Sequence, residues 1–149
     1  MRITLLVISL FLVISGCTQQ SNPQTKTKSA AEDPLCNPVP IRKLDSEQKG
    51  KAIAQLVNGV DKAVAVHIDD ELDVAIEVTN FNRLRLESIE KEVAQNLKAE
   101  FPKIKIHVSS DKKILNELQK LSDMPYASEQ KGACDQKKKL KQIEKQMKG

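Results

Sequence analysis

Two histidines and a nearby carboxylate are residue types that could bind a transition metal. His67 and His107 each lie in a stretch in which apolar and polar residues alternate. Such alternation predicts β-strands, and both imidazoles fall at the polar positions of their strands. If the strands are neighbours, the imidazoles and the carboxylate of Asp73 could coordinate a transition metal. Their spacing matches no metal-binding signature, so two exposed strand histidines are the favoured interpretation and the metal site is the alternative.

A compact acidic cluster lies between two strand-like stretches. It consists of Asp69, Asp70, Glu71 and Asp73. Carboxylate oxygens are the ligands that Ca²⁺ prefers. The stretch lacks the loop glycine and the distal glutamate of an EF-hand, so a solvated turn is the favoured interpretation.

The sequence shows no pattern typical of the common enzyme classes. It contains no recognisable Ser-His-Asp order, no glycine-rich phosphate loop and no Cys-x-x-Cys motif. We therefore expect a protein that is not an enzyme.

The beginning of the chain has the layout of a secretory signal peptide. Arg2 precedes an apolar stretch of about a dozen residues, and small residues follow it. The four residues at its end are Ile14, Ser15, Gly16 and Cys17. They resemble the bacterial lipobox, whose cysteine receives a diacylglyceryl lipid and becomes the new N-terminus. The alternatives are an ordinary signal peptide cut before a free cysteine, or an uncleaved anchor.

Lipidation of Cys17 would determine where the protein resides. An anchor of two or more acyl chains, such as palmitate, holds a small domain stably on a membrane. We expect the protein on the outer face of a bacterial membrane, with this covalent lipid as its sole cofactor.

Cys36 and Cys134 are the other two cysteines. If Cys17 carries lipid, an even number of thiols remains in an exported chain, which is compatible with one disulfide. That bond would close a loop of about 100 residues, for which the chain-entropy model gives roughly 4 to 5 kcal/mol of stabilisation. Two free thiols are the alternative.

The C-terminal segment is rich in lysine. Residues 131–149 hold seven lysines and two acidic residues, and Leu140, Ile143 and Met147 lie at helical spacing. This pattern favours a basic amphipathic segment that contacts anionic lipid or a cell-wall polymer, with a solvated helix as the alternative. The candidate contact residues are Lys137, Lys138, Lys139, Lys141, Lys145 and Lys148. Nucleic acid is not expected, because the segment has no aromatic stacking group.

Periodicity predicts the secondary-structure elements that position these residues. In chain order they are a helix within 44–60, strands within 62–69 and 72–79, a helix within 83–101, a strand within 103–110 and a helix within 111–121. Asp45 or Ser46 should cap the first helix, and Ser110 or Asp111 the last. The first two strands form a hairpin, because only a short acidic link separates them.

The order αββαβα predicts an α+β fold, a two-layer sandwich. We expect a three-stranded mixed sheet in which the third strand lies beside the first and the helices cover one face. The other face would be exposed, with Ala65, His67, Ala75, Lys105 and His107 on it. A protein partner could bind there by lying against the face or by strand addition, and a merely solvated face is the alternative.

These features divide the chain into four parts. The signal peptide spans 1–16, the lipid anchor and a disordered tether span 17–44, the α+β domain spans 45–123, and a linker with the lysine-rich tail spans 124–149. The tether is assigned from its richness in Pro, Ser, Thr, Asn and Gln without apolar periodicity.

Residues 45–121 resemble the YhcN/YlaJ family of sporulation lipoproteins. The resemblance is carried by the lipobox and by the pieces "LVNGVDKAVAV", "LDVAIEV" and "KIKIHVSSDKKILNELQKL". It implies a lipoprotein of the spore or forespore membranes, linked to spore formation, germination or outgrowth, with no established enzymatic activity. The paired extra cysteines and the lysine-rich end depart from the family pattern.

Two functions are compatible with the sequence. The favoured one is a membrane-anchored spore lipoprotein that acts as a non-enzymatic structural or interaction module. The alternative is a lipoprotein that binds a small ligand or a metal through its histidines and acidic cluster.

Overall fold

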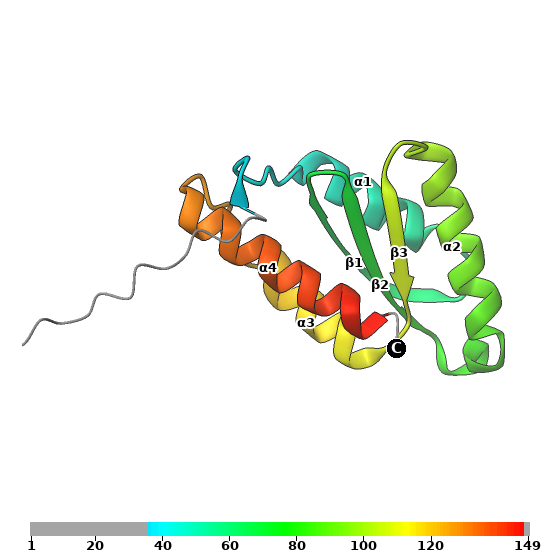
Figure 1. Ribbon diagram of the computed structural model, residues 1–149. Helices are drawn as coiled ribbons and strands as arrows, with labels where there is room; N and C mark the ends of the chain where they lie inside the picture. Colours follow the sequence, from blue (N-terminus) through cyan, green and yellow to red (C-terminus); the bar gives the residue numbers. More distant parts are fainter. Residues whose placement is uncertain (1–35, 148–149) are drawn as a thin grey trace, which may run out of the picture. The chain divides into compact units, whose positions relative to one another are not determined.

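The computed structural model describes residues 36–147 of the chain (Figure 1). In chain order the elements are α1 (Leu44–Gln55), β1 (Val60–Ile68), β2 (Glu71–Val78), the 3-10 helix η2 (Asn80–Arg85), α2 (Leu86–Glu100), β3 (Lys105–Ser109), α3 (Lys112–Ser122) and α4 (Gln130–Met147). The α+β class and the predicted order αββαβα are confirmed, and α4 follows this series. Among these residues, no helix combines the length and apolar character required to cross a bilayer.

The three strands form a mixed sheet with β2 in the centre. β1 and β2 pair antiparallel through a two-residue turn, in which Asp69 has a φ of 58°. β3 pairs parallel with β2, so the sheet order is β1-β2-β3 and the expectation that β3 lies beside β1 is wrong. The outer edge of β1 is partly occupied by the chain before α1, since Arg42 forms a bridge with Ile68.

Helices cover both faces of the sheet, which corrects the expected two-layer arrangement with helices on one face (Figure 1). On one face, α1 and α2 enclose an aliphatic cluster made of Ala54, Val57, Ala63, Ala65, Leu72, Val74, Ile76, Ile89, Val93 and Leu97. On the other face, α3 and α4 enclose a cluster made of Val64, Val66, Ile68, Ala75, Ile114, Leu115, Leu118, Leu121, Leu140 and Ile143.

The register of the hairpin explains why both faces of the sheet are covered. Ala65 lies opposite Val74, and Val64 lies opposite Ala75, so each face receives apolar residues from both strands. Strands with apolar side chains on both sides are typical of a sheet that is covered twice. Ala65, His67 and Ala75, predicted to be exposed, are buried. Lys105 is exposed and His107 is partly buried, so the five residues predicted for a protein-binding face do not form one exposed surface.

The lysine-rich segment belongs to the domain. α4 packs on the sheet beside α3, and its Leu140 and Ile143 are buried. The predicted boundary at residue 123 therefore falls between two helices that share one hydrophobic core.

The domain also begins before residue 45, within the predicted tether. Ile41 and Lys43 hydrogen-bond to Asp69 and His67 at the end of β1. α1 follows Lys43 directly and has no side-chain cap, so the predicted cap by Asp45 or Ser46 is wrong. Asp111 caps α3 as predicted, by accepting hydrogen bonds from the amides of Lys113 and Ile114.

Candidate functional site

Three side chains from three different elements meet between the sheet and α4. Asp73 of β2 is the register partner of His107 of β3, so both side chains emerge on the same face of the sheet. His107 Nδ1 lies 2.8 Å from Asp73 Oδ1. Glu144 of α4 completes the group, and the three candidate ligand atoms all lie within 4.8 Å of one another. We call these three residues the carboxylate-histidine cluster.

His67 is not part of this cluster. It lies opposite Leu72, whereas Asp73 lies opposite Val66, so His67 and Asp73 point to opposite faces of the sheet. His67 is fully buried, and its Nε2 lies 3.1 Å from the carbonyl oxygen of Asp69. Burial, followed by the positive charge of Lys43, lowers the pKa of His67. Of the three predicted metal residues, the structure thus brings together Asp73 and His107. The third member of the cluster is Glu144 and not His67.

Glu144 was not predicted as a site residue because it lies in the segment assigned as a tail. The apolar stripe of Leu140 and Ile143 was the available signal. Glu144 follows Leu140 by four residues, so the two share one helix face, and a buried stripe brings that carboxylate under α4.

The carboxylates of the cluster are buried and incompletely hydrogen-bonded. The side chain of Asp73 is 0% exposed and that of Glu144 is 5% exposed. Asp73 Oδ2 and Glu144 Oε1 have no hydrogen-bond partner among the residues that the structure describes. Burial is the main cause that raises the pKa of Asp73 to about 6; the hydrogen bond from His107 opposes the shift, and the charge of Glu144 adds to it.

A buried ion-pair network adjoins the cluster. Glu71 accepts a hydrogen bond from Lys137 at 2.8 Å and another from Lys141, which also donates to Glu144 Oε2 at 3.1 Å. Burial acts to raise the pKa of Glu71, but the two lysines outweigh it and lower the pKa to about 2. Glu71 is therefore an internal ion-pair partner, not a member of a solvated turn.

The other carboxylates at the hairpin tip also have basic partners. Asp69 lies 3.2 Å from Lys137, and Asp70 lies 3.7 Å from Lys105. These carboxylates therefore form ion pairs with neighbouring lysines. A calcium loop would instead need six to eight oxygen ligands directed at one point.

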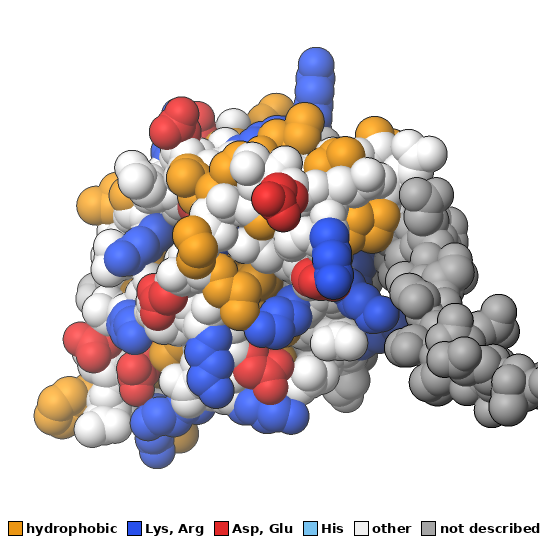
Figure 2. All heavy atoms as spheres, turned by 90° about the vertical axis from the view of Figure 1, so that its left-hand side faces the viewer, with side chains coloured by type: hydrophobic (Ala, Val, Ile, Leu, Met, Phe, Trp, Pro, Cys, Tyr) orange, Lys and Arg blue, Asp and Glu red, His pale blue; other side chains and the backbone are white. Residues whose placement is uncertain are grey.

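The same contacts divide the predicted anionic-surface lysines into two groups. Lys137 is buried and Lys141 is partly buried, and both bind Glu71 within the domain. Lys138, Lys139 and Lys145 are exposed, and Lys148 lies outside the described residues. On the side where α4 begins, Figure 2 shows basic side chains interspersed with acidic and apolar ones, without a continuous basic patch.

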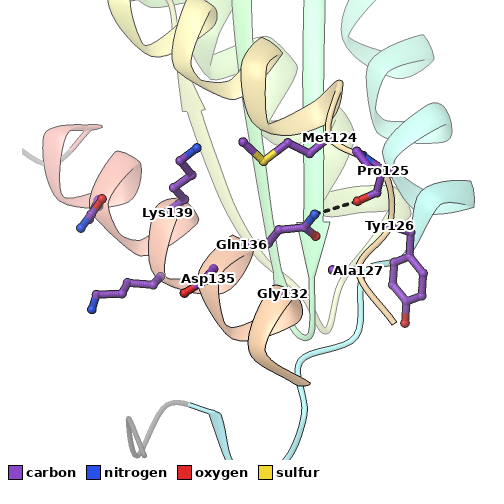
Figure 3. Close-up of a pocket in the computed structure, with 10 residues that line it drawn as sticks. Met124, Pro125, Tyr126, Ala127, Gly132, Asp135, Gln136 and Lys139 are labelled. Atoms are coloured by element: carbon purple, nitrogen blue, oxygen red, sulfur yellow. Dashed lines mark hydrogen bonds between the residues drawn. The ribbon is translucent and has the colours of Figure 1, made fainter. Parts of the chain in front are cut away.

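A pocket lies between α4 and the connection that follows α3 (Figure 3). It has a volume of about 620 Å³ and is lined by Met124, Pro125, Tyr126, Ala127, Gly132, Asp135, Gln136, Lys138, Lys139 and Gln142. Gln136 holds the connection in place by donating a hydrogen bond of 2.8 Å to the carbonyl of Pro125. The lining contains no histidine or thiol, and the pocket is separate from the carboxylate-histidine cluster.

Two long-range links fasten the N-terminal residues to the last helices. Cys36 and Cys134 form a disulfide with Cα atoms 5.2 Å apart, which is one of the two alternatives that the cysteine count left open. The buried guanidinium of Arg42 pairs with Glu47 at 2.7 Å. It also donates hydrogen bonds to the carbonyls at the end of α3, which belong to Leu121, Ser122 and Met124.

Comparisons of the chain with protein-family models, with curated proteins and with solved structures return no match. The resemblance to the YhcN/YlaJ family rests on the sequence pieces described above. Cys17 and its neighbours Ile14, Ser15 and Gly16 lie outside the described residues.

Proposed function

We propose that this protein is a lipid-anchored module on the outer face of a bacterial membrane, and that it works by contact and not by catalysis. The lipobox that ends at Cys17 supports the anchor. The resemblance to sporulation lipoproteins supports a spore or forespore membrane, with a role in spore formation, germination or outgrowth.

The observation that carries the contact role is a pair of fully exposed apolar side chains on η2. Phe81 is 98% exposed and Leu84 is 101% exposed. A large apolar side chain that touches nothing in its own domain is available to a partner. Arg83 and Arg85 lie in the same short helix, and both are exposed.

This combination favours an anionic lipid surface as the partner. Phe and Leu insert at the boundary between headgroups and acyl chains, while basic residues pair with anionic headgroups. Each cation near such a surface contributes about 1 kcal/mol. The segment Asn80–Arg85 thus takes the membrane-contact role that the sequence analysis gave to the lysines of α4.

The length of the N-terminal segment permits this contact. The hydrogen-bonded end of β1, near residues 41–43, and η2 lie at opposite ends of the β1-β2 hairpin. Nine residues of β1 correspond to about 30 Å. Cys36 lies 19 positions after Cys17, and a chain of that length reaches up to about 65 Å. A lipid on Cys17 and η2 can therefore engage one membrane together.

Fractionation and intact-mass analysis test the anchor. In a spore-forming host, the wild-type chain should be found in the membrane fraction and begin at Cys17 with added acyl mass. Cys17→Ala should lack the acyl mass. An unlipidated wild-type chain would remove the anchor from the proposal.

Vesicle sedimentation tests the contact separately. Residues 18–149, produced without the signal peptide, should bind vesicles that contain phosphatidylglycerol. The pair Phe81→Ser with Leu84→Ser should reduce that binding by at least about tenfold, because two inserted side chains contribute well over 1.4 kcal/mol. Ile41→Ser with Leu44→Ser is the matched control, since these side chains are 58% and 46% exposed and lie at the other end of the hairpin. Equal loss in both pairs would refute a specific role for η2.

A further inference from the structure

We propose that Asp73, His107 and Glu144 bind one Zn²⁺ ion between β2, β3 and α4. This inference goes beyond the membrane contact and does not depend on it. The three residues come from two neighbouring strands and the last helix, and their ligand atoms lie within 4.8 Å of one another.

The strongest argument is the pair of buried oxygens without partners. Asp73 Oδ2 and Glu144 Oε1 lack a hydrogen bond among the described residues, although neither side chain is more than 5% exposed. Buried carboxylates are normally paired, hydrogen-bonded or bound to a metal. A divalent cation would satisfy both oxygens and balance both negative charges.

The types of donor atom favour zinc over calcium or magnesium. Imidazole nitrogen and carboxylate oxygen are both ligand types that zinc binds, and zinc sites with three protein ligands take water in the fourth position. Calcium needs six to eight oxygen ligands, and magnesium rarely accepts nitrogen. The side chain of His107 is 20% exposed, so one side of the cluster is open to solvent.

Neighbouring groups already orient one of the carboxylates. Lys141 donates to Glu144 Oε2 and so leaves Oε1 directed away from that ion pair. Hydrogen bonds of this kind hold metal ligands in place. Lys141 also binds Glu71, so the buried ion-pair network fixes the position of the lysine that orients Glu144.

Zinc binding should draw the three elements together. Ligand atoms around a tetrahedral zinc ion lie about 3.4 Å apart, given metal-ligand distances near 2.1 Å. Because Glu144 comes from α4, an ion at this position would connect the last helix directly to the two strands. The competing explanation is a single proton shared between the two carboxylates.

Calorimetry with Zn²⁺ alone distinguishes the two. The full chain, purified in detergent and stripped of metal with a chelator, should bind one Zn²⁺ per molecule, and zinc should raise its thermal midpoint. Co²⁺ in place of Zn²⁺ should give the intense visible absorption of a tetrahedral site. Asp73→Asn and Glu144→Gln keep the side-chain shapes but remove a charged ligand. Each should weaken Zn²⁺ binding at least about 100-fold, the upper end of the loss caused when only a ligand's hydrogen-bond partner is removed.

Asp70→Asn is the matched control. Its side chain is 65% exposed and lies outside the cluster, so this variant should bind Zn²⁺ like the wild type. Far-UV circular dichroism of each variant verifies that the fold is retained. The proposal is overturned if the wild type binds no Zn²⁺, or if Asp73→Asn and Glu144→Gln bind it as tightly as the wild type. A metal-free wild type that Asp73→Asn merely stabilises, without any zinc effect, would assign the cluster to a shared proton.

Discussion

The two faces of the sheet are built differently. The face covered by α1 and α2 has an aliphatic centre that runs from Leu72 to Ile76 on the strands and from Ile89 to Leu97 on α2. The face covered by α3 and α4 has a similar aliphatic centre but also encloses Asp73, Glu144 and the ion pair of Glu71 with Lys137. The α1/α2 face also buries His67, whereas the α3/α4 face buries three carboxylates and a lysine. Ionisable groups cost free energy when buried, so this larger number of charges needs a cause.

The difference indicates a division of roles. An aliphatic layer stabilises a domain without offering any chemistry. Buried ion pairs are weak evidence for stability, because well-packed apolar residues often replace them without loss. The α3/α4 face therefore carries charges that folding alone does not require, and it is the face on which we expect binding chemistry.

Removal of the disulfide should have the largest effect and should act on the two faces unequally. The bond joins residues 98 positions apart. The variant Cys36→Ser with Cys134→Ser should lose about 4 to 5 kcal/mol in urea unfolding, according to the chain-entropy model. Because Cys134 lies in α4, amide hydrogen exchange should accelerate more in α4 than in α2. Equal acceleration of hydrogen exchange in α4 and α2 would show that the disulfide stabilises both faces of the sheet alike.

Truncation of a core leucine on the aliphatic face should have the next largest effect. Leu97 is 0% exposed. Leu97→Ala should lower the free energy of unfolding by about 3 kcal/mol, because it removes apolar contacts and leaves a cavity. Leu84→Ala is the same substitution at a side chain that is 101% exposed, and it should change stability by less than about 0.5 kcal/mol. A small loss in Leu97→Ala would show that α2 is loosely packed.

Disruption of the buried ion pair tests the charged face. Lys137→Met should cost about 2 to 3 kcal/mol, somewhat less than the usual loss for one partner of a buried pair, because Lys141 still binds Glu71. Glu71→Leu combined with Lys137→Met should recover most of that loss. Lys137→Met alone leaves the buried carboxylate of Glu71 with one partner fewer, and Glu71→Leu removes that carboxylate. Lys139→Met, at an exposed position of α4, is the control. If the double variant is no more stable than Lys137→Met alone, the pair contributes net stability and our division of roles is wrong.

Acid sensitivity should come from the edge of the α1/α2 face. The pKa of His67 is lowered in the folded protein, so the unfolded chain binds this proton more tightly than the folded one. The contribution of neutral, buried His67 to the free energy of unfolding is therefore fully present above the unfolded pKa of about 6.5, and it is lost as the pH falls below that value. His67→Gln should show a shallower decline of unfolding free energy between about pH 7 and pH 5. Identical slopes would assign the acid sensitivity to other groups.

The elements of the fold were predictable because local periodicity encodes them. The alternation in β1 and β2, the stripe of Ile89, Val93 and Leu97, and the cap at Asp111 all depend on neighbours in sequence. The number of covered faces was harder to predict. Ala63 and Ala65 flank Val64, and alanine at such positions fits a tightly covered face as well as an exposed one.

The candidate site was only partly predictable, because its geometry depends on register and on α4. The pairing of Asp73 with His107 follows from the parallel alignment of β2 and β3. His67 was misplaced because a one-residue change in register moves a side chain to the other face. Glu144 lies beside His107 and Asp73, which are 37 and 71 positions away, and Arg42 binds carbonyl groups 79 to 82 positions away, so no local pattern reports these contacts.

Arg42 has a consequence for how the domain is made. Its guanidinium binds carbonyl groups 79 to 82 residues further along the chain, so its contacts cannot form until α3 has been synthesised. Contacts of this range slow folding, because a long loop must close before they form. A product that ends before α3 would leave the arginine beside Glu47 but without its carbonyl partners. A buried guanidinium without these partners destabilises the domain, so we expect proteases to degrade prematurely terminated chains faster than the full-length protein.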